Sequence, residues 1–539
     1  WRTPPLCYTC KRAVAFATAL RDSVLSYDLA RLSRREKLAF GTLALLLIVA
    51  RVVALFRYRF ETDESQHLHV AWGWTAGLVQ YRDLFDNHPP LFHLLSSFFL
   101  RGASERADIL LFARAPMLVL WGIVLWGTWV VARRLYDAHV AAWSVLLLAV
   151  FPTFFLRTVE YRADHLWNVC WILAVVVVFA RPLTPARSFI AGLLLGCALA
   201  TSLRTSLLVI TLLLAGAIVY GVRHAWRLLP GALGFAIVPA ALALYFMRLD
   251  AWDELVYYVF TFNAELSQSR VTIWIGRILW PFAIAALFVI ARKKKLGLLP
   301  ASVALFVVTL FCLWPLISPR DFLAIMPFLA ILIVAHLPRR VVIAVTALWL
   351  LSLAYYTDGF TNRTDEHITM MNQALRLTRP GEPVMDLKGE TIYRPRPFFH
   401  ALETITRARL DAGLLRDTIP EDVVRAKCHV AQADGPLFPP RGREFLRAHF
   451  LDVGRLRVSG QPLQPDGTFT IAVPGEYVLL NEGGEARGTL DGTPYGGARQ
   501  LETGTHRFVS VNPGEALAVL WAPAFRRGHT PFHLRDREF

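Results

Sequence analysis

About eleven apolar runs, each long enough to cross a membrane, occupy the first two thirds of this chain. They lie near residues 38–57, 109–132, 139–154, 165–180, 188–203, 205–221, 229–248, 277–291, 297–316, 321–337 and 341–356. A helix rises about 1.5 Å per residue, so the longer runs span the hydrocarbon core and the shorter ones need local thinning or half-buried flanks. The chain is therefore predicted to be a polytopic α-helical membrane protein.

The apolar excess stops near residue 357. Of 539 residues 55% are hydrophobic, but residues 358–539 have the mixed charges, turns and short strands of a water-soluble domain. The predicted parts are a cytoplasmic segment (1–36), a transmembrane domain (37–357), an α/β region (358–453) and a β-sandwich-like region (454–539).

Basic residues between the apolar runs predict the topology. The net charge of +16 is compatible with nucleic-acid binding only if Lys and Arg cluster on a soluble face, and here they flank membrane segments instead. Alternate loops carry Arg31, Arg34, Arg35 and Lys37, then Arg133 and Arg134, Arg181 and Arg187, Arg223 and Arg227, Arg292 to Lys295, and Arg339 and Arg340. The N-terminus is therefore expected inside and the C-terminal domain outside, with outer loops at 58–108, 155–164, 203–205, 249–276 and 317–320.

The first outer loop, 58–108, holds most of the candidate chemistry. Asp63 and Glu64 follow the first span directly, and apolar positions then recur at helical spacing, which predicts an amphipathic helix from Glu64 to Val79 in the membrane interface. His88-Pro89-Pro90 ends this segment, and a second interfacial helix follows. The histidines are expected to be interfacial side chains, since their spacing gives no zinc geometry.

The outer motifs, taken together, resemble the GT-C type membrane glycosyltransferases, in particular family 39 with the protein O-mannosyltransferases and the lipid A aminoarabinose transferases. The matching residues are Asp63-Glu64, Gly77, Tyr81-Arg82-Asp83, His88-Pro89-Pro90-Leu91, Arg162 with Asp164, Ser318-Pro319-Arg320 and Met326-Pro327. The resemblance covers about residues 1–357. It implies a GT-C fold and transfer of a sugar from a polyprenyl-phosphate carrier at the outer face.

The resemblance assigns candidate catalytic carboxylates. Asp63 is expected to take the proton of the acceptor hydroxyl, Glu64 to orient the acceptor or the helix, and Asp164 to help form the pocket. The alternative for Asp63 and Glu64 is a first-turn pair of acids that meets the helix dipole. For Asp164 the alternative is a structural contact with Arg162.

The departing phosphate needs fixed cations near the outer face. Arg320, Arg204, Arg270 and His88 are the candidates, although His88 stands where aminoarabinose transferases often have lysine. Snorkelling at the interface is the alternative for the arginines. Arg82, Asp83, Tyr161 and Arg162 complete the predicted substrate pocket.

The soluble tail alternates helical and strand-like segments. Helices are expected at 364–378, 421–427 and 441–449, and strands at 384–387 and 428–432. Five short strands between turns follow from about residue 454 and predict a β-sandwich or jelly roll. Arg394 and Arg396, which lie beside aromatic residues in the α/β region, are expected on the solvated surface, and the alternative is a face toward the membrane or a glycan.

The leading hypothesis is an inverting glycosyltransferase of a bacterial cytoplasmic membrane. Its expected partners are a polyprenyl-phosphate-linked sugar, a lipid, glycan or protein acceptor and membrane lipids, with no nucleic acid. No cofactor is expected to be required for the chemistry, and a divalent metal stays an open alternative. The rival hypothesis is a transporter or flippase of a lipid-linked sugar, which inverted repeats and midplane polar residues would favour; neither is evident in the sequence.

Overall fold

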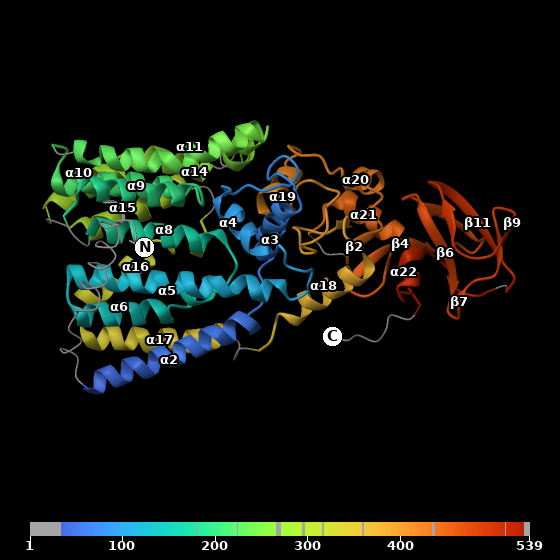
Figure 1. Ribbon diagram of the computed structural model, residues 1–539, viewed down its shortest axis with the longest axis horizontal. Coiled ribbons are helices and arrows are strands. Elements are labelled where there is room, and N and C mark those ends of the chain that lie inside the picture. The colour runs from blue at the N-terminus through green and yellow to red at the C-terminus, as the bar shows by residue number, and fades with distance from the viewer. Residues whose placement is uncertain are drawn as a thin grey trace, which may run out of the picture.

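The computed structural model describes residues 34–179, 182–223, 225–265, 271–293, 297–314, 317–357, 361–433, 437–512 and 514–532. Figure 1 shows a bundle of helices at one end and a lobe of helices and strands at the other, with α3 (Thr62–Thr75) and α4 (Leu91–Leu100) where they meet. Most of the predicted cytoplasmic segment 1–36 and the candidate phosphate ligand Arg270 lie outside the described residues.

A helix occupies the position of each predicted apolar run. These helices are α2 (Arg34–Arg57), α5 (Ile109–Leu135), α6 (Ala138–Val150), α8 (Ala163–Phe179), α9 (Pro185–Leu199), α10 (Thr205–Tyr220), α11 (Leu229–Arg248), α14 (Val271–Lys293), α15 (Leu298–Leu313), α16 (Met326–His336) and α17 (Arg339–Tyr356). Within the described ranges, five segments are long and apolar enough to cross a membrane, namely Phe40–Arg57, Ile109–Leu135, Ala225–Arg248, Trp274–Ala291 and Arg339–Tyr356. A multi-pass membrane protein is thus confirmed, while about eleven crossings stay a prediction.

Short helical pieces connect the bundle helices. They are α7 (Pro152–Arg157), η2 (Ala225–Leu228), α12 (Trp252–Val256), η3 (Tyr257–Thr261), α13 (Phe262–Glu265) and η4 (Pro319–Phe322). Pro152 and Pro319 occupy the first turns of α7 and η4, where a missing backbone N–H costs no intrahelical bond. All of these pieces except η2 lie in or beside the predicted outer loops, which carry the candidate site.

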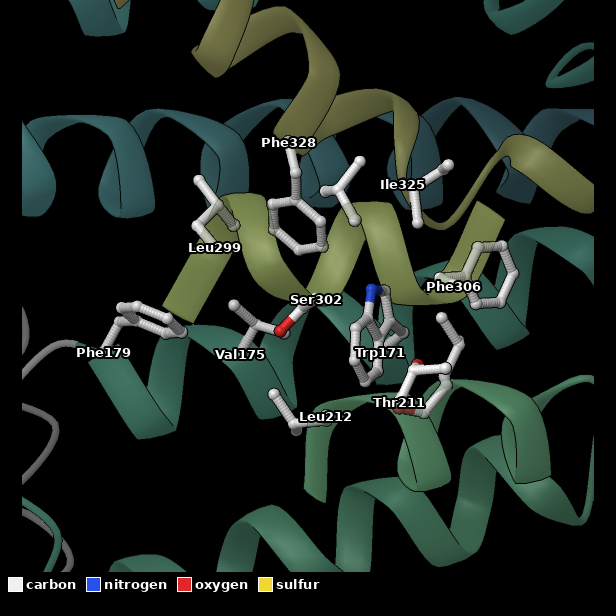
Figure 2. Close-up of a pocket in the computed structure, with 12 residues that line it drawn as sticks. Trp171, Val175, Phe179, Thr211, Leu212, Leu299, Ser302, Phe306, Ile325 and Phe328 are labelled. Atoms are coloured by element: carbon white, nitrogen blue, oxygen red, sulfur yellow. The ribbon is translucent and has the colours of Figure 1, made fainter. Parts of the chain in front are cut away.

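The bundle is packed through small residues and apolar side chains. A Cβ on Gly192 of α9 would lie 1.9 Å from the carbonyl oxygen of Gly231 in α11, so this helix pair requires glycine for its close approach. Figure 2 shows an apolar cavity deeper in the bundle, lined from α8, α10, α15 and α16. The hydroxyl groups of Thr211 and Ser302 there donate to their own helix backbones, and Trp171 donates to the carbonyl of Ala324 at 3.0 Å. The polar atoms of this cavity are therefore satisfied locally.

Helix α3 differs from its predicted environment. An amphipathic helix in the membrane interface would expose its polar side chains, whereas Gln66, His67 and His69 are at most 4% exposed. The C-terminal domain covers His69, where Gly389 lies so close that a Cβ on it would be 2.7 Å from the histidine. Gln66 and His67 are buried against the first outer loop and α4, where they contact Asp86 and His93. The helix exists as predicted, but it is a buried element between the two parts of the molecule.

The C-terminal domain contains the helices and strands that the sequence predicted, together with α19, α22, β3, β4, β7, β9 and β10, which it did not predict. Its helices are α18 (Asp365–Leu377), α19 (Thr404–Asp411), α20 (Ile419–Arg425), α21 (Pro440–His449) and α22 (Ala522–Arg526). Its strands are β1 (Val384–Met385), β2 (Val430–Gln432), β3 (Phe450–Asp452), β4 (Leu456–Pro462), β5 (Thr468–Ile471), β6 (Gly475–Asn481), β7 (Gly484–Glu485), β8 (Gly488–Leu490), β9 (Thr493–Tyr495), β10 (Arg499–Leu501), β11 (Gly504–Ser510) and β12 (Ala518–Trp521).

One sheet joins the two regions that were predicted to part at residue 453. Its order is β1-β2-β4-β12-β6-β10, with β3 on β4 and β7 on β6, and a second sheet has the order β5-β11-β8-β9. Val430 of β2 is opposite Val458 of β4, and Val384 packs in the same apolar core as Leu479. The two regions therefore share one hydrophobic core. The sequence did not predict this, because no local pattern specifies which distant strands pair.

Two arginines of the C-terminal domain are buried rather than solvated. Arg394 is 1% exposed and binds Glu105, at the end of the first outer loop, at 2.8 Å. Arg396 binds Asp386 at 2.7 Å. Both ion pairs fix the chain segment 386–396 that lies against α3, so the prediction of a solvated surface is wrong here.

Candidate active site

A cavity of about 500 Å³ lies where the bundle, the first outer loop and the C-terminal domain meet. One part of its wall is apolar and comes from bundle helices and their connections, including Leu203, Leu207, Phe260, Leu313 and Trp314. The polar residues that line the cavity are Asp63, Gln66, Asn87, His88, Ser202, Arg204, Asn263, Arg277, Lys388, Glu403 and Thr404. The cavity therefore combines an apolar surface with a set of charged groups.

Helix α3 places Asp63 in this cavity. Thr62 begins the helix, so Asp63 lies in the first turn, where free backbone N–H groups favour a negative charge. Its carboxylate forms ion pairs with Arg162 and with Lys388, the latter at 2.8 Å. Burial acts to raise the pKa of Asp63, but Arg162 and Lys388 outweigh it and hold the pKa well below its usual value. Asp63 is therefore ionised throughout the neutral range.

Lys388 reaches Asp63 from a rigid loop of the C-terminal domain. Asp386 begins this loop and accepts hydrogen bonds from the backbone N–H groups of Gly389 and Thr391, each at 2.8 Å. His69 of α3 contacts the carbonyl oxygen of Ile392 at 2.8 Å. Lys388 Nζ also donates to the hydroxyl of Thr62 at 2.9 Å. The loop therefore holds an ammonium group over the start of α3.

Glu390, two residues after Lys388, gives this loop a pH dependence. Burial, reinforced by the neighbouring Asp386, raises the pKa of Glu390 to about 7. A carboxyl group whose folded pKa exceeds its unfolded value binds more protons when folded, so its contribution to stability is lost as pH rises through the folded pKa. We expect the free energy of unfolding to fall by roughly 2 to 3 kcal/mol between about pH 4.5 and pH 7 from this group. Glu390→Gln should flatten that part of a stability–pH curve, and an unchanged slope would contradict the assignment.

Two arginines connect Asp63 with further carboxylates. Arg162 Nε binds Asp164 at 3.0 Å, and Arg204 Nη1 binds the other oxygen of Asp164 at 2.5 Å. Arg204 Nε binds Asp321 at 2.6 Å. The predicted contact between Arg162 and Asp164 thus exists, and it links Asp63 to the cavity-lining Arg204.

Arg320 belongs to the same network but is farther from the cavity. It binds Glu160 at 3.0 Å and lies 3.6 Å from Glu61. Glu160 in turn lies 3.9 Å from Arg162. Arg320 is therefore linked to Asp63 through Glu160 and Arg162, and within the described part of the chain it does not line the cavity.

Glu64 faces away from the cavity. Its two oxygens bind Arg114 at 2.6 and 2.7 Å and also accept the backbone N–H groups of Tyr161 and Glu61, at 2.7 and 2.9 Å. Both side chains of the Glu64–Arg114 pair are fully buried. Glu64 therefore has the contacts of a structural first-turn acid, which was the alternative in the sequence analysis. Its catalytic role stays a prediction.

His88 lines the cavity and belongs to a buried polar cluster. His88 Nδ1 contacts Asp86 at 2.8 Å, His93 Nδ1 lies 3.3 Å from the same carboxylate, and His93 Nε2 contacts His67 at 2.8 Å. Burial acts to lower the pKa of His88, but Asp86 outweighs it and raises the pKa above the usual value. His88 therefore carries a positive charge at higher pH than an ordinary histidine. In the part of the chain that is described, no group of three or more His, Cys, Asp or Glu side chains is suited to a metal ion.

The remaining predicted pocket residues lie elsewhere. Arg82 and Asp83 pair with each other at 2.9 Å, and Arg82 donates to the carbonyl of Leu249 at 2.8 Å. Tyr161 packs on Phe92 and lines a separate apolar cavity between α4 and α5. Among the described residues that line the main cavity, none of these three appears.

The main cavity has residues that the sequence analysis did not select. Lys388 and Glu403 come from the C-terminal domain, which the motif resemblance does not cover, and Asn263 and Arg277 come from the region around the start of α14. Asn263 donates to the carbonyl oxygen of Asn87 at 2.8 Å, which holds the His88 loop in place. Lysine is rare in the soluble tail, and this rarity is the only sequence feature that distinguishes Lys388.

Comparison with solved structures identifies the fold. ArnT from Cupriavidus metallidurans bound to undecaprenyl phosphate matches with a TM-score of 0.53 at 13% identity, over 77% of this chain and 97% of that chain. The apo state of the same protein matches with a TM-score of 0.51 at 15% identity, over 78% and 97%. The archaeal oligosaccharyltransferase AglB from Archaeoglobus fulgidus matches with a TM-score of 0.41 at 10% identity, over 74% and 70%.

Neither a protein-family model nor a curated protein sequence matches this chain. The structural similarity is therefore detected by backbone geometry at an identity where sequence alone shows little. At the level of fold it agrees with the motif resemblance to aminoarabinose transferases. The chain has the GT-C type membrane fold, extended by a C-terminal domain of helices and β-sheet.

Proposed function

We propose that this chain is an inverting glycosyltransferase that moves a sugar from a polyprenyl-phosphate-linked donor to a lipid, glycan or protein acceptor. The observation that carries the proposal is the main cavity, whose lining combines the paired Asp63 and Lys388 and the nearby Arg204 with apolar side chains. A lipid phosphate needs both a cationic and an apolar surface. The bound undecaprenyl phosphate of the similar ArnT structure is a lipid of this kind.

The chemistry requires one proton transfer and one displacement. The acceptor hydroxyl oxygen bonds to the anomeric carbon, the bond from that carbon to the carrier phosphate breaks with its electron pair on the phosphate, and Asp63 takes the hydroxyl proton. Lys388, Arg204 and His88 stabilise the departing phosphate through charge-assisted hydrogen bonds. One displacement at the anomeric carbon inverts its configuration.

Lys388 has two partners in this scheme. In the free protein it neutralises Asp63, and a donor phosphate in the cavity competes for the same ammonium group. When Lys388 turns to the phosphate, Asp63 loses one of the two cations that lower its pKa and becomes a stronger base. Binding of the donor thus raises the basicity of Asp63.

Glu64 and Asp164 have positioning roles in this scheme. They hold Asp63 and the arginines in place.

Lys388→Met is expected to lower kcat/KM by roughly ten- to a hundredfold, because the departing phosphate loses one donor. Removal of the ammonium also raises the pKa of Asp63, so the acidic limb of the pH–rate profile should move to higher pH. The exposed Lys427→Met, which removes the same charge from the same domain, is the matched control. A lower rate with an unmoved acidic limb of kcat/KM would contradict the contact between Lys388 and Asp63 in the free protein.

The proposed site faces the outer side of a bacterial cytoplasmic membrane. Arg133 and Arg134 lie in the last turn of α5, whose start follows the Glu105–Arg394 ion pair with the C-terminal domain. Arg339 and Arg340 begin α17, whose other end leads toward that domain, so both basic pairs support a positive-inside orientation. In this proposal the N-terminus is cytoplasmic and the C-terminal domain is periplasmic or extracytoplasmic.

A panel of radiolabelled polyprenyl-phosphate sugars tests the function. Purified full-length protein in vesicles should release free polyprenyl phosphate from one donor and label an acceptor, with EDTA and Mg²⁺ arms to test the expectation that no metal is required. No turnover with any donor, together with movement of a donor between the leaflets, would support the flippase and contradict the transferase. The same assay will compare wild type with Asp63→Asn. Asp137→Asn, at the N-cap of α6 at the other end of the bundle, is the matched control for that substitution.

A further inference from the structure

Asp86 is a buried carboxylate in the first outer loop to which the proposed reaction gives no role. Its side chain is fully buried, and one of its oxygens lies 2.8 Å from Nδ1 of His88. The other oxygen accepts a hydrogen bond from Nε2 of Gln80 at 2.7 Å and lies 3.3 Å from Nδ1 of His93. A carboxylate that is taken out of water needs such donors, and a positive charge on a donor strengthens the bond. Asp86 therefore favours the protonated form of a histidine beside it.

The surrounding side chains hold Asp86 in one position. The carbonyl oxygen of the Gln80 side chain accepts a hydrogen bond from the indole N–H of Trp74 at 3.2 Å, so the NH₂ group of Gln80 is turned to Asp86. On the other side, the hydroxyl of Tyr81 donates to the backbone carbonyl oxygen of His88 at 2.5 Å. Both partners of the Asp86–His88 contact are therefore fixed by the loop itself.

His88 lies between this carboxylate and the main cavity, which it lines. The side chain of His88 is 35% exposed, whereas that of Asp86 is 0% exposed. Since a carboxylate only accepts, Nδ1 of His88 carries a hydrogen, and the second proton of a charged imidazole is then on Nε2. Among the described residues Nε2 has no hydrogen-bond partner. The Nε2–H of a charged His88 is thus available to an anion in the cavity.

Charged and titratable groups reach His88 from several elements. They are His67 and Asp63 from α3, His93 from α4, Arg162 from the loop before α8, and Arg204, Arg277, Lys388 and Glu403 in the cavity wall. Burial lowers the pKa of His67 well below its usual value and that of His93 to about 4. Burial and Arg162 act to lower the pKa of His88, but Asp86 and Asp63 outweigh them and raise it. Of the three histidines, His88 is therefore the one that carries a charge near neutrality.

We propose that Asp86 is a positioning residue for the donor phosphate: it turns Nε2 of His88 toward the main cavity and keeps His88 protonated. This role rests on the proposed function, because it requires a polyprenyl-phosphate donor in that cavity. The donor is a phosphodiester with one constant charge, so its affinity falls when His88 loses its proton as the pH rises. Asp86 moves this loss of affinity to higher pH.

Binding of undecaprenyl methyl phosphate to the purified full-length protein tests this role. The probe is a phosphodiester like the donor and keeps one negative charge at every pH used, so a change with pH comes from the protein. Asp86→Asn keeps the shape of the side chain but removes its charge. It should weaken binding roughly tenfold at about pH 7.5, and at most about threefold at about pH 5, where His88 is protonated more readily. Asp137→Asn, at the N-cap of α6, should bind like wild type at both pH values.

A double-variant cycle assigns the effect to His88. In a His88→Gln background, Asp86→Asn should cause no further loss that depends on pH, because the group that Asp86 protonates is gone. Two results would overturn the role of Asp86. One is an equal loss of affinity at both pH values for Asp86→Asn, which a merely structural residue would give. The other is a loss in the His88→Gln background as large and as pH-dependent as in wild type.

The wild-type profile keeps the test decisive if Asp86→Asn does not fold. Wild-type affinity should fall with a midpoint above about pH 6.5, the usual pKa of histidine, and His88→Gln should lack this fall. A midpoint below that value would contradict stabilisation of the charged His88 by Asp86. Sugar transfer is not measured, so the two failures are distinct. Wild type that binds no probe at any pH contradicts the proposed function and this role with it, whereas binding without these pH differences contradicts only the role of Asp86.

Discussion

Asp63→Asn is expected to lower the rate of sugar transfer by roughly a hundred- to ten-thousandfold, the usual contribution of a general base. Asparagine has nearly the same shape and keeps an oxygen toward Arg162 and Lys388, but its amide cannot accept the acceptor's proton. The measurement is kcat/KM for the best donor of the panel, with donor affinity measured separately.

Donor affinity provides the internal control for this variant. With the carboxylate gone, Lys388 is no longer neutralised, so the donor phosphate should bind at least as tightly as to wild type. A variant that binds the donor and does not transfer the sugar would establish Asp63 as the base. Wild-type turnover by Asp63→Asn would remove Asp63 from the chemistry and leave the cavity as a binding site.

Arg114→Met should be the most destabilising single change near the site, lowering the free energy of unfolding by about 3 to 5 kcal/mol, because it leaves the Glu64 carboxylate buried and unpaired. Arg114 also donates to the carbonyl oxygens of Tyr58 and Arg59 at 2.7 and 2.8 Å, so the end of α2 loses its attachment to α5. Thermal unfolding in detergent measures the loss.

The double variant Glu64→Gln/Arg114→Met separates the two causes. It removes the unpaired charge, and it should recover a substantial part of the stability that Arg114→Met loses. A double variant as unstable as the single one would show that the carbonyl contacts, and not the buried charge, carry the effect. If Glu64→Gln abolishes transfer in a fully folded protein, Glu64 has a catalytic role beyond its structural one.

The sequence was most informative where local chemistry decides the structure. Apolar runs predicted the position of each bundle helix because a backbone in an apolar environment must satisfy its hydrogen bonds within a helix, and Asp63 was selected because it follows the first predicted span directly. Some strands of the C-terminal domain were predicted from turn residues and β-branched side chains, but β4 (Leu456–Pro462), which lies inside the large sheet, was not. At α3 the polar pattern suggested an exposed helix, since a sequence does not show that another domain covers it.

Tertiary contacts explain what the sequence did not predict. Lys388 is separated from Asp63 by more than 300 residues, so only the folded loop that Asp386 organises brings them together. Arg82 and Asp83 matched the family motif, yet they pair with each other at the surface. The single sheet across residue 453 depends on pairing between β2 and β4.

Single-turnover release of free polyprenyl phosphate, measured side by side for wild type, Lys388→Met and Asp63→Asn, tests the central claim most directly. The proposed mechanism predicts a graded series, with Lys388→Met roughly ten- to a hundredfold slower than wild type and Asp63→Asn slower still by about another tenfold or more. Equal release by all three proteins would contradict the mechanism, because neither the base nor the cation at the departing phosphate would then matter.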